Sequence, residues 1–278
     1  MFKNRNVIKN IQLEFYGGFG NNIQQIALGI MYCDKYKKNL IINNHKLIND
    51  FFYRKSIFPQ TKFYPIYRGR FFYFGSLRDE ITPIDYPLYK SDYDYYTNNF
   101  HITIKNKIKL HLNFLKEIKI DSKSLVIHIR KMEGHPDYVQ NPVDFYKKLF
   151  ELYEHIIVVT DDPYSPLLNK LKSLKKFDIQ SSSVEEDFNL LASSKNLATS
   201  GVGTFSIAAS MISNNLENIY YSNFFLDRHL NPEMLRDTIS KHRFKVEGHL
   251  GYGNWNKNKN FLNEQLLKKI NVKKIDNF

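Results

Sequence analysis

The chain has 278 residues, of which 42% are hydrophobic and 24% are charged, and its formal net charge is +12. This length predicts two domains of roughly 100–200 residues each, and the composition excludes wholesale disorder and collagen-like repeats. Cys33 is the one cysteine, so an internal disulfide and a zinc site built on several cysteines are excluded. There is no run of about 18 apolar residues, and Met1–Lys9 lacks the apolar core of a signal peptide. We therefore expect a cytoplasmic protein.

The surplus of positive charge favours negatively charged partners, such as nucleic acid, an anionic membrane face or phosphorylated small molecules. Only nine of the 40 basic residues are Arg, whereas proteins that read nucleic-acid sequence rely on the bidentate contacts of Arg. No RNA-binding motif or zinc spacing is present. We interpret most of the charge as solvated surface and expect no nucleic acid partner. A basic nucleic-acid-binding protein, and peripheral association with the inner face of a membrane, stay open as alternatives.

The first part of the chain has the order strand, glycine-rich turn, helix, strand, which is typical of a βαβ unit. The apolar residues of Val7–Tyr16 indicate a strand, and Gly17–Gly20 indicates a turn. A helical stripe follows, made of Ile23, Ile26, Ala27, Ile30 and Met31. The short apolar run Leu40–Ile42 predicts a second buried strand.

Residues 51–100 are rich in aromatic side chains but have little periodicity, which favours loops and short elements, some of them lining a cleft. Aromatic rings there either stack on the sugar rings of a ligand or pack in the core and between domains. Residues 101–120 alternate Ile or Leu with Lys and predict a helix that closes the first half. We place the domain boundary near residue 118, giving domains at 1–118 and 119–278.

The second part continues the alternation of strands and helices. Strands are expected at Leu125–Ile129, Ile156–Val159, Leu197–Ala198 and, as the last one, Ile219–Tyr221. Helices are expected after Asn141-Pro142, after Pro163 to about Lys175, around Val184–Ala192, and from Ser206 through Ile212. Asn141 is a candidate cap for the first of these. The polar tail from about residue 230 is expected to be helical in places and to pack back on the first half. The fold class is therefore α/β, with two Rossmann-like domains facing a central cleft.

Ligands of open α/β sheets bind outside the carboxyl ends of the strands, and a first polar segment lies at such a position. Gly17–Asn22 follows the first predicted strand. It is either a tight turn or a loop whose backbone closely approaches a phosphate or sugar at a helix N-terminus. Neither the dinucleotide-binding glycine pattern nor a phosphate-binding loop with Lys is matched.

His128 and Arg130 form the second candidate, at the tip of a buried strand, and strand alternation places them on the same face. An Arg at this position needs an anion. The anion is either a structural partner such as Glu133 or Asp137, or a diphosphate that the guanidinium grips with two hydrogen bonds.

The third candidate is a pair of loops. Thr160-Asp161-Asp162-Pro163 follows a strand, and its carboxylates either cap the next helix or bind a base or ribose. Ser200–Ser206 offers hydroxyl groups and backbone N–H groups at the start of a helix, which is a natural anion site. Thr204 and Ser206 could equally serve as helix caps.

Taken together, these segments resemble the metal-independent fucosyltransferases, the superfamily of α1,2-, α1,6- and protein O-fucosyltransferases with a glycosyltransferase B architecture. Gly18-Phe19-Gly20-Asn21 resembles the family's Gly-x-Gly-Asn loop, and His128-Ile129-Arg130 resembles its His-x-Arg motif. Thr160–Pro163 is similar to the Thr-Asp-Asp-Pro of the α1,6 branch, and Thr204-Phe205-Ser206 to the motif before the last helix. The motifs occur in the family's order over about residues 11–215.

The resemblance implies that 1–118 is an acceptor-side domain and 119–278 a nucleotide-sugar-binding domain, and it implies a role for each matching residue. Arg130 would grip the β-phosphate of GDP-fucose, His128 would contact the nucleotide, and Asp161 or Asp162 would bind guanine or ribose. Thr204, Phe205 and Ser206 would hold the diphosphate and base. Asn21 would lie near the β-phosphate and the acceptor, and Gly18 and Gly20 of the same loop would also bind the donor. It implies no metal and no cofactor beyond the donor. The partners would be a nucleotide sugar and an oligosaccharide or glycolipid acceptor.

Inverting transfer also needs a base for the acceptor hydroxyl, and we favour Glu133 over His135 and Asp137. Glu133 takes the place of the Asp that the family often has after the histidine. Asp92-Tyr93-Asp94 imitates the metal-binding D-x-D motif of another transferase architecture, but no convincing strand precedes it. The sequence therefore predicts an inverting fucosyltransferase. A transferase for another nucleotide-activated sugar and a non-catalytic sugar-binding relative are the alternatives.

Overall fold

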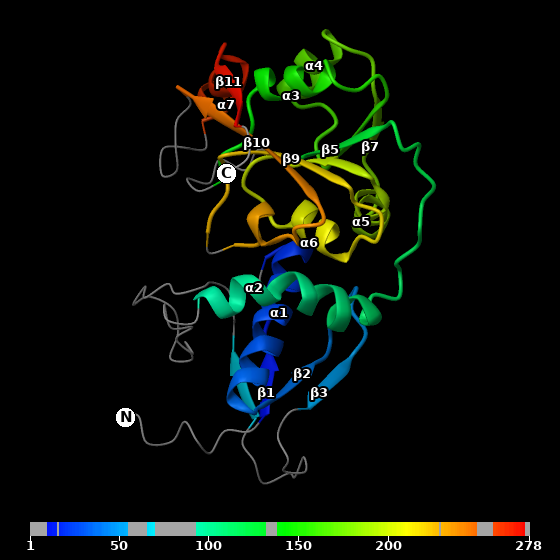
Figure 1. Ribbon diagram of the computed structural model, residues 1–278, viewed down its shortest axis with the longest axis vertical. Helices are drawn as coiled ribbons and strands as arrows, with labels where there is room; N and C mark the ends of the chain where they lie inside the picture. Colours follow the sequence, from blue (N-terminus) through cyan, green and yellow to red (C-terminus); the bar gives the residue numbers. More distant parts are fainter. Residues whose placement is uncertain are drawn as a thin grey trace. The chain divides into compact units, whose positions relative to one another are not determined.

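The computed structural model describes residues 10–15, 17–54, 66–69, 93–131, 138–227, 229–248 and 258–275. The chain divides into two compact units, Met1–Leu115 and Lys116–Phe278, and each is described by itself (Figure 1). The assignment of an acceptor side and a donor side to two domains stays a prediction.

The first unit contains a four-stranded sheet in the order β3-β2-β1-β4. Strand β1 is parallel to both β2 and β4, whereas β3 is antiparallel to β2. The described strands are β1 (Asn10–Leu13), β2 (Asn39–Ile42), β3 (Phe51–Arg54) and β4 (Ile66–Gly69). The strand predicted over Val7–Tyr16 is thus shorter, because Glu14 and Phe15 already lie outside it.

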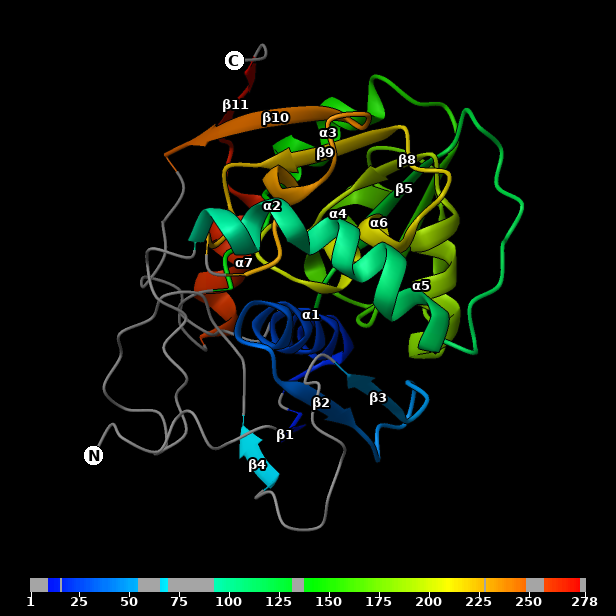
Figure 2. The ribbon, with the colours of Figure 1, turned by 60° about the horizontal axis from the view of Figure 1, so that its bottom comes forward.

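Helix α1 (Phe19–Tyr36) lies over this sheet (Figure 2). It begins four residues before the first residue of the predicted stripe, Ile23, and that stripe is buried. The helix approaches the sheet closely at Gly29, where an added Cβ would lie 2.9 Å from a methyl group of Leu13 and 3.1 Å from Leu40. A side chain at this position would push the helix off the strands.

The segment from 93 to 111 is helical throughout, but it changes its hydrogen-bond pattern along its length. Helix α2 (Tyr93–Thr103) continues into a π-helix, η2 (Ile104–Ile108), and a 3-10 turn, η3 (Lys109–His111). The helix predicted over 101–120 therefore ends early, and residues 112–120 have no helix. The π-helix carries Lys107, whose Nζ donates to Asp34 Oδ2 and Tyr53 Oη, both at 2.7 Å. These bonds hold η2 against α1 and β3.

The second unit contains a seven-stranded sheet in the order β11-β10-β9-β8-β5-β6-β7. All neighbours are parallel except β10 and β11, which are antiparallel. The strands are β5 (Leu125–Ile129), β6 (Ile156–Thr160), β7 (Asp178–Gln180), β8 (Asn196–Ala198), β9 (Asn218–Ser222), β10 (Ser240–Glu247) and β11 (Asn271–Ile275). The continuous β-branched and apolar runs of β5 and β6 fit strands that are covered on both faces.

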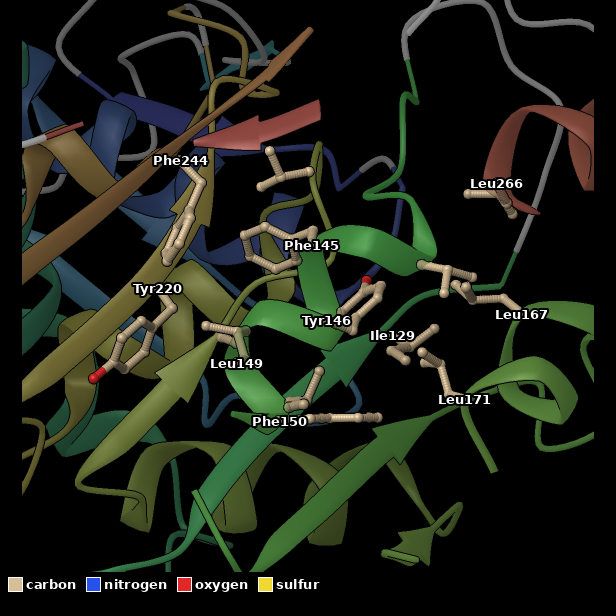
Figure 3. Packing of buried hydrophobic residues seen from close by; sticks show 14 of the residues in the cluster. Ile129, Phe145, Tyr146, Leu149, Phe150, Leu167, Leu171, Tyr220, Phe244 and Leu266 are labelled. Atoms are coloured by element: carbon tan, nitrogen blue, oxygen red, sulfur yellow. The ribbon is translucent and has the colours of Figure 1, made fainter. Parts of the chain in front are cut away.

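Helices cover both faces of this sheet, with α3 and α4 on one side and α5 and α6 on the other (Figure 1). The helical elements are α3 (Val143–Phe150), α4 (Pro166–Lys172), α5 (Val184–Ser193), α6 (Phe205–Ile212), the 3-10 turn η4 (Pro232–Met234) and α7 (Lys259–Leu267). The main core lies under α3, where Phe145 and Leu149 belong to one buried cluster with Phe244 of β10 and Leu171 of α4 (Figure 3).

Two expectations about the second unit were wrong. Ile219–Tyr221 is not the last strand, because the tail contributes β10 beside β9 and then β11 at the sheet edge. Asn141 does not cap α3, whose cap residue is Pro142. The side chain of Asn141 instead donates to Thr199 O at 2.8 Å and accepts from Ser222 Oγ. Asn141 therefore connects the strand ends.

Candidate functional site

The strand order of the second unit defines where a ligand would bind. From β5 the chain moves to one side through β6 and β7, then crosses back to β8, β9 and β10 on the other side. This is the order 3-2-1-4-5-6 of dinucleotide-binding sheets, whose ligands bind outside the carboxyl ends where the order reverses. The reversal lies between β5 and β8, which pair through Ile127 and Ala198. The candidate site is thus formed by the segments after these two strands.

Arg130 directly follows β5 and is held by a short neighbouring segment. Its guanidinium carbon lies 4.2 Å from the centre of the Tyr138 ring, which is a cation–π geometry. The side chain of the buried Gln140 donates to the backbone oxygens of Arg130 and Lys131, both at 3.0 Å. The next amide, of Lys131, donates to Asp161 Oδ1 at 2.6 Å. The backbone that carries Arg130 is therefore fixed from two directions.

The Thr160–Pro163 loop lies beside Arg130, but it does not cap the next helix. Ser165 caps α4 by accepting from the amide of Leu168, so the alternative that a carboxylate of this loop caps the helix is wrong. Asp161 is placed where it binds the Lys131 amide. The amide of Asp162 donates to Thr160 Oγ1 at 3.1 Å, so its backbone is part of the same turn. A nucleotide-binding role for Asp161 or Asp162 stays a prediction.

His128 is buried, with 7% of its surface exposed, and its ring packs against Phe205 of α6. Its ring centre lies 5.5 Å from that of Phe205, which in turn lies 5.4 Å from Phe188. Among the described residues, the buried Nδ1 atom has no hydrogen-bond partner. Burial, and secondly the charge of Arg130, lower the pKa of His128 to about 3. The imidazole is therefore neutral at physiological pH.

The second segment of the candidate site is the loop between β8 and α6. Gly201 has a φ of +104°, and an added Cβ would lie 2.5 Å from the backbone oxygen of Val139. Thr204 is the cap residue of α6, with no side-chain capping bond. Ser206 is 1% exposed, and its hydroxyl oxygen has no hydrogen-bond partner in the part of the chain that the structure describes. Unpaired buried polar atoms are rare. Two of those among the described residues lie close to the candidate site: one on His128, near the carboxyl end of β5, and one on Ser206, in the first turn of α6.

The glycine-rich segment belongs to the first unit and is described separately. Gly17 has a φ of +79°, and Gly18 is the cap residue of α1. Gly20 and Asn21 lie in the first turn of the helix. The next residue, Asn22, accepts from His45 Nε2 at 3.0 Å and donates to Gln25. The structure thus places the predicted loop at the carboxyl end of β1, and a role for it in ligand binding stays a prediction.

Several predicted residues lie outside the described parts of the chain. These are Glu133, His135 and Asp137, and also Asp92 of the D-x-D motif. Asp94, the other acid of that motif, lies in the first turn of α2. Within the described ranges, no group of three or more His, Cys, Asp or Glu side chains is arranged to hold a metal ion. No described helix is long and apolar enough to cross a membrane.

Sequence reasoning missed Tyr138 and Gln140, which contact Arg130 and its backbone. Both residues lie between Glu133 and Pro142, the cap residue of α3, in a stretch without periodicity. The one available signal was their position, because the segment after a strand tip and before a crossover helix borders the ligand site.

The neutral state of His128 predicts an acid-sensitive fold. A buried imidazole with a pKa of about 3 binds its proton only below pH 3, whereas the unfolded chain binds it near pH 6.5. The free energy of unfolding should therefore fall as the pH drops through 6.5, by about 1–2 kcal/mol at pH 5, and level off below pH 3. We expect His128→Phe to remove this part of the pH dependence in denaturant unfolding at pH 7 and pH 5.

The matched control is His155→Phe, which removes an exposed imidazole from the same unit. An unchanged difference between pH 7 and pH 5 in His128→Phe would show that His128 is not neutral in the folded protein.

The fold and site together define the second unit as an α/β sheet with dinucleotide-binding strand order and an Arg-containing edge. No protein-family model matches the chain, and no curated protein matches it in sequence. Among solved structures, the chain is similar to a crystal structure of POFUT1 in complex with GDP, at a TM-score of 0.43 and 8% identity. The match covers 77% of this chain and 98% of that one.

Proposed function

We propose that the protein is an inverting, metal-independent glycosyltransferase that moves fucose from GDP-fucose to a hydroxyl group of a glycan or lipid-linked oligosaccharide. The observation that carries the proposal is the position of Arg130 and of the α6 start, which follow the adjacent strands β5 and β8 where the strand order reverses. The four motifs that resemble the fucosyltransferases support the choice of donor, since three of them lie at carboxyl strand ends of this sheet.

The chemistry needs positive potential at the leaving diphosphate. Without a metal, a guanidinium and the N–H groups of a helix start are the available sources. The guanidinium of Arg130 would bind two phosphate oxygens with parallel hydrogen bonds, and the first backbone N–H groups of α6, after Thr204, would donate to the same diphosphate. Both groups would stabilise the same developing charge, because they follow the carboxyl ends of the adjacent strands β5 and β8.

The transfer itself is a single displacement. The acceptor oxygen forms a bond with the anomeric carbon of fucose, while the bond from that carbon to the β-phosphate oxygen breaks. Attack from the face opposite the diphosphate inverts the anomeric centre and gives an α-linked fucose. The acceptor proton passes to Glu133, which lies outside the described residues. GDP leaves with both electrons of the broken bond.

The base and ribose would lie against the neutral surface formed by His128 and Phe205. The pKa of His128 is about 3, so the imidazole adds no charge and offers a hydrogen bond. Nδ1 of His128 and Oγ of Ser206, which have no partner among the described residues, are suited to polar groups of a nucleotide. The ring of Phe205 could stack on an aromatic base. These features favour a nucleotide over a free sugar phosphate.

Thermal unfolding with GDP, UDP, CMP and RNA tests the proposal. A ligand present at 100 times its dissociation constant adds about 2.7 kcal/mol to the free energy of unfolding. We expect this stabilisation with GDP alone, and we expect EDTA to leave it unchanged. Equal stabilisation by UDP or CMP would contradict the choice of donor. Stabilisation by RNA alone would support a nucleic-acid-binding protein instead.

A further inference from the structure

The segment Tyr138–Asn141, which we call the strap, is bonded to both segments of the candidate site: the residues after β5, which include Arg130, and the loop after β8. It contacts the backbone that carries Arg130, and it also pairs with the loop after β8. Neither contact arises from the regular sheet, since Gln140 and Gly201 form an isolated antiparallel bridge outside the named strands. The strap is therefore hydrogen-bonded to each of the two segments that form the candidate site.

On the Arg130 side, the strap supplies one ring and one buried amide. The Tyr138 ring lies 4.2 Å from the guanidinium carbon of Arg130, which restricts the orientation of the side chain. The side-chain nitrogen of Gln140 donates to two consecutive backbone oxygens, those of Arg130 and Lys131. Gln140 is 2% exposed, so water cannot easily replace these bonds.

On the other side, the strap is bonded to the loop from Thr199 to Val202. The amide of Val202 donates to Val139 O at 2.9 Å, and the amide of Asn141 donates to Ser200 O at 3.0 Å. The side chain of Asn141 adds a bond to Thr199 O at 2.8 Å. This loop leads directly into the cap residue of α6. A shift of the strap would therefore move the loop as well.

We infer that the strap is a positioning element that fixes Arg130 and the loop before α6 relative to one another, so that both bind one diphosphate. Tyr138 and Gln140 are its positioning residues. The inference rests on the proposed function for the identity of the ligand, but the coupling itself is a property of the ligand-free protein. Preorganised groups bind more tightly because less ordering is needed on binding.

Hydrogen exchange without ligand tests the coupling. We expect Gln140→Leu to speed exchange of the Lys131 and Val202 amides by about tenfold or more. Gln180→Leu is the matched control, because it removes a side-chain amide bond, to Asp187, elsewhere in the same unit. Unchanged exchange at Lys131 and Val202 in Gln140→Leu would overturn the inference, whatever the ligand proves to be.

Calorimetric titration with GDP tests the role of the ring. We expect Tyr138→Leu to weaken binding about 5- to 10-fold, while Tyr138→Phe, which keeps the ring, stays within about 2-fold of the unaltered protein. In an Arg130→Gln background, Tyr138→Leu should add less than about 2-fold, because the ring acts through the guanidinium. Full additivity would overturn the positioning role. No GDP binding by the unaltered protein would instead contradict the proposed function.

Discussion

Replacing Arg130 with Ala is expected to weaken GDP binding by about 100-fold or more and to abolish transfer. Each hydrogen bond from a charged donor contributes about 1.5–3 kcal/mol, and a guanidinium can form two of them with one phosphate. Arg130→Lys keeps the charge but loses the paired geometry, so an intermediate loss of about tenfold is expected. Isothermal titration with GDP measures both effects.

The fold should tolerate these changes, because Arg130 follows β5 and its backbone is held by Gln140 through the main-chain oxygen. Arg243→Ala is the matched control. Its guanidinium also lies over a ring, that of Phe225 at 5.3 Å, and pairs with Glu233 in the same unit. We expect Arg243→Ala to leave GDP affinity unchanged. Near-normal binding by Arg130→Ala would remove the guanidinium from the site.

The strands nearest the candidate site could be predicted from the sequence because their residues allow few other structures. Leu125–Ile129 and Ile156–Thr160 are short runs of mostly β-branched residues, each ended by polar ones. Such runs, alternating with helical stripes, indicate a parallel sheet with helices on both faces. The positions of Arg130 and Thr204 at strand and helix ends followed from the same patterns.

The tail strands could not be predicted, because their stabilising contacts are distant in the sequence. Ser240–Glu247 mixes Lys, His, Arg and Glu with the buried Phe244 and Val246, so its composition resembles an exposed segment. It becomes a strand because β9 offers a free edge for parallel pairing. Strand propensity depends on such neighbours more than helix propensity does.

The hydrogen-bond partners of individual polar residues could not be predicted from the sequence either. Asn141 before Pro142 has the sequence of a helix cap, yet its side chain bonds to Thr199 and Ser222. Asp161 follows a strand, as ligand-binding acids often do, but its carboxylate accepts a hydrogen bond from the amide of Lys131. In both cases a partner from another strand end competes with the local interaction. Only the sheet order brings these partners together.

Gly201→Ala is expected to lower the free energy of unfolding by about 3 kcal/mol and to weaken GDP binding. Gly201 has a φ of +104°, which costs a residue with a Cβ about 1–3 kcal/mol. The new Cβ would also lie 2.5 Å from Val139 O and 3.0 Å from Gln140 Cα, both backbone atoms. The loop and the strap must therefore separate. Denaturant unfolding and GDP titration measure the two effects.

Gly203→Ala separates the conformational requirement from a general effect of adding a methyl group to this loop. Gly203 lies two residues further along, and the nearest atom to an added Cβ there is Ser200 Oγ at 3.6 Å, an ordinary contact. Its φ is outside the left-handed region, so Ala should change stability by less than about 1 kcal/mol and can even raise it by restricting the unfolded chain. Equal losses in the two variants would mean that the loop fails through the added volume alone. A loss confined to Gly201→Ala would show that close contact with the strap sets the loop geometry.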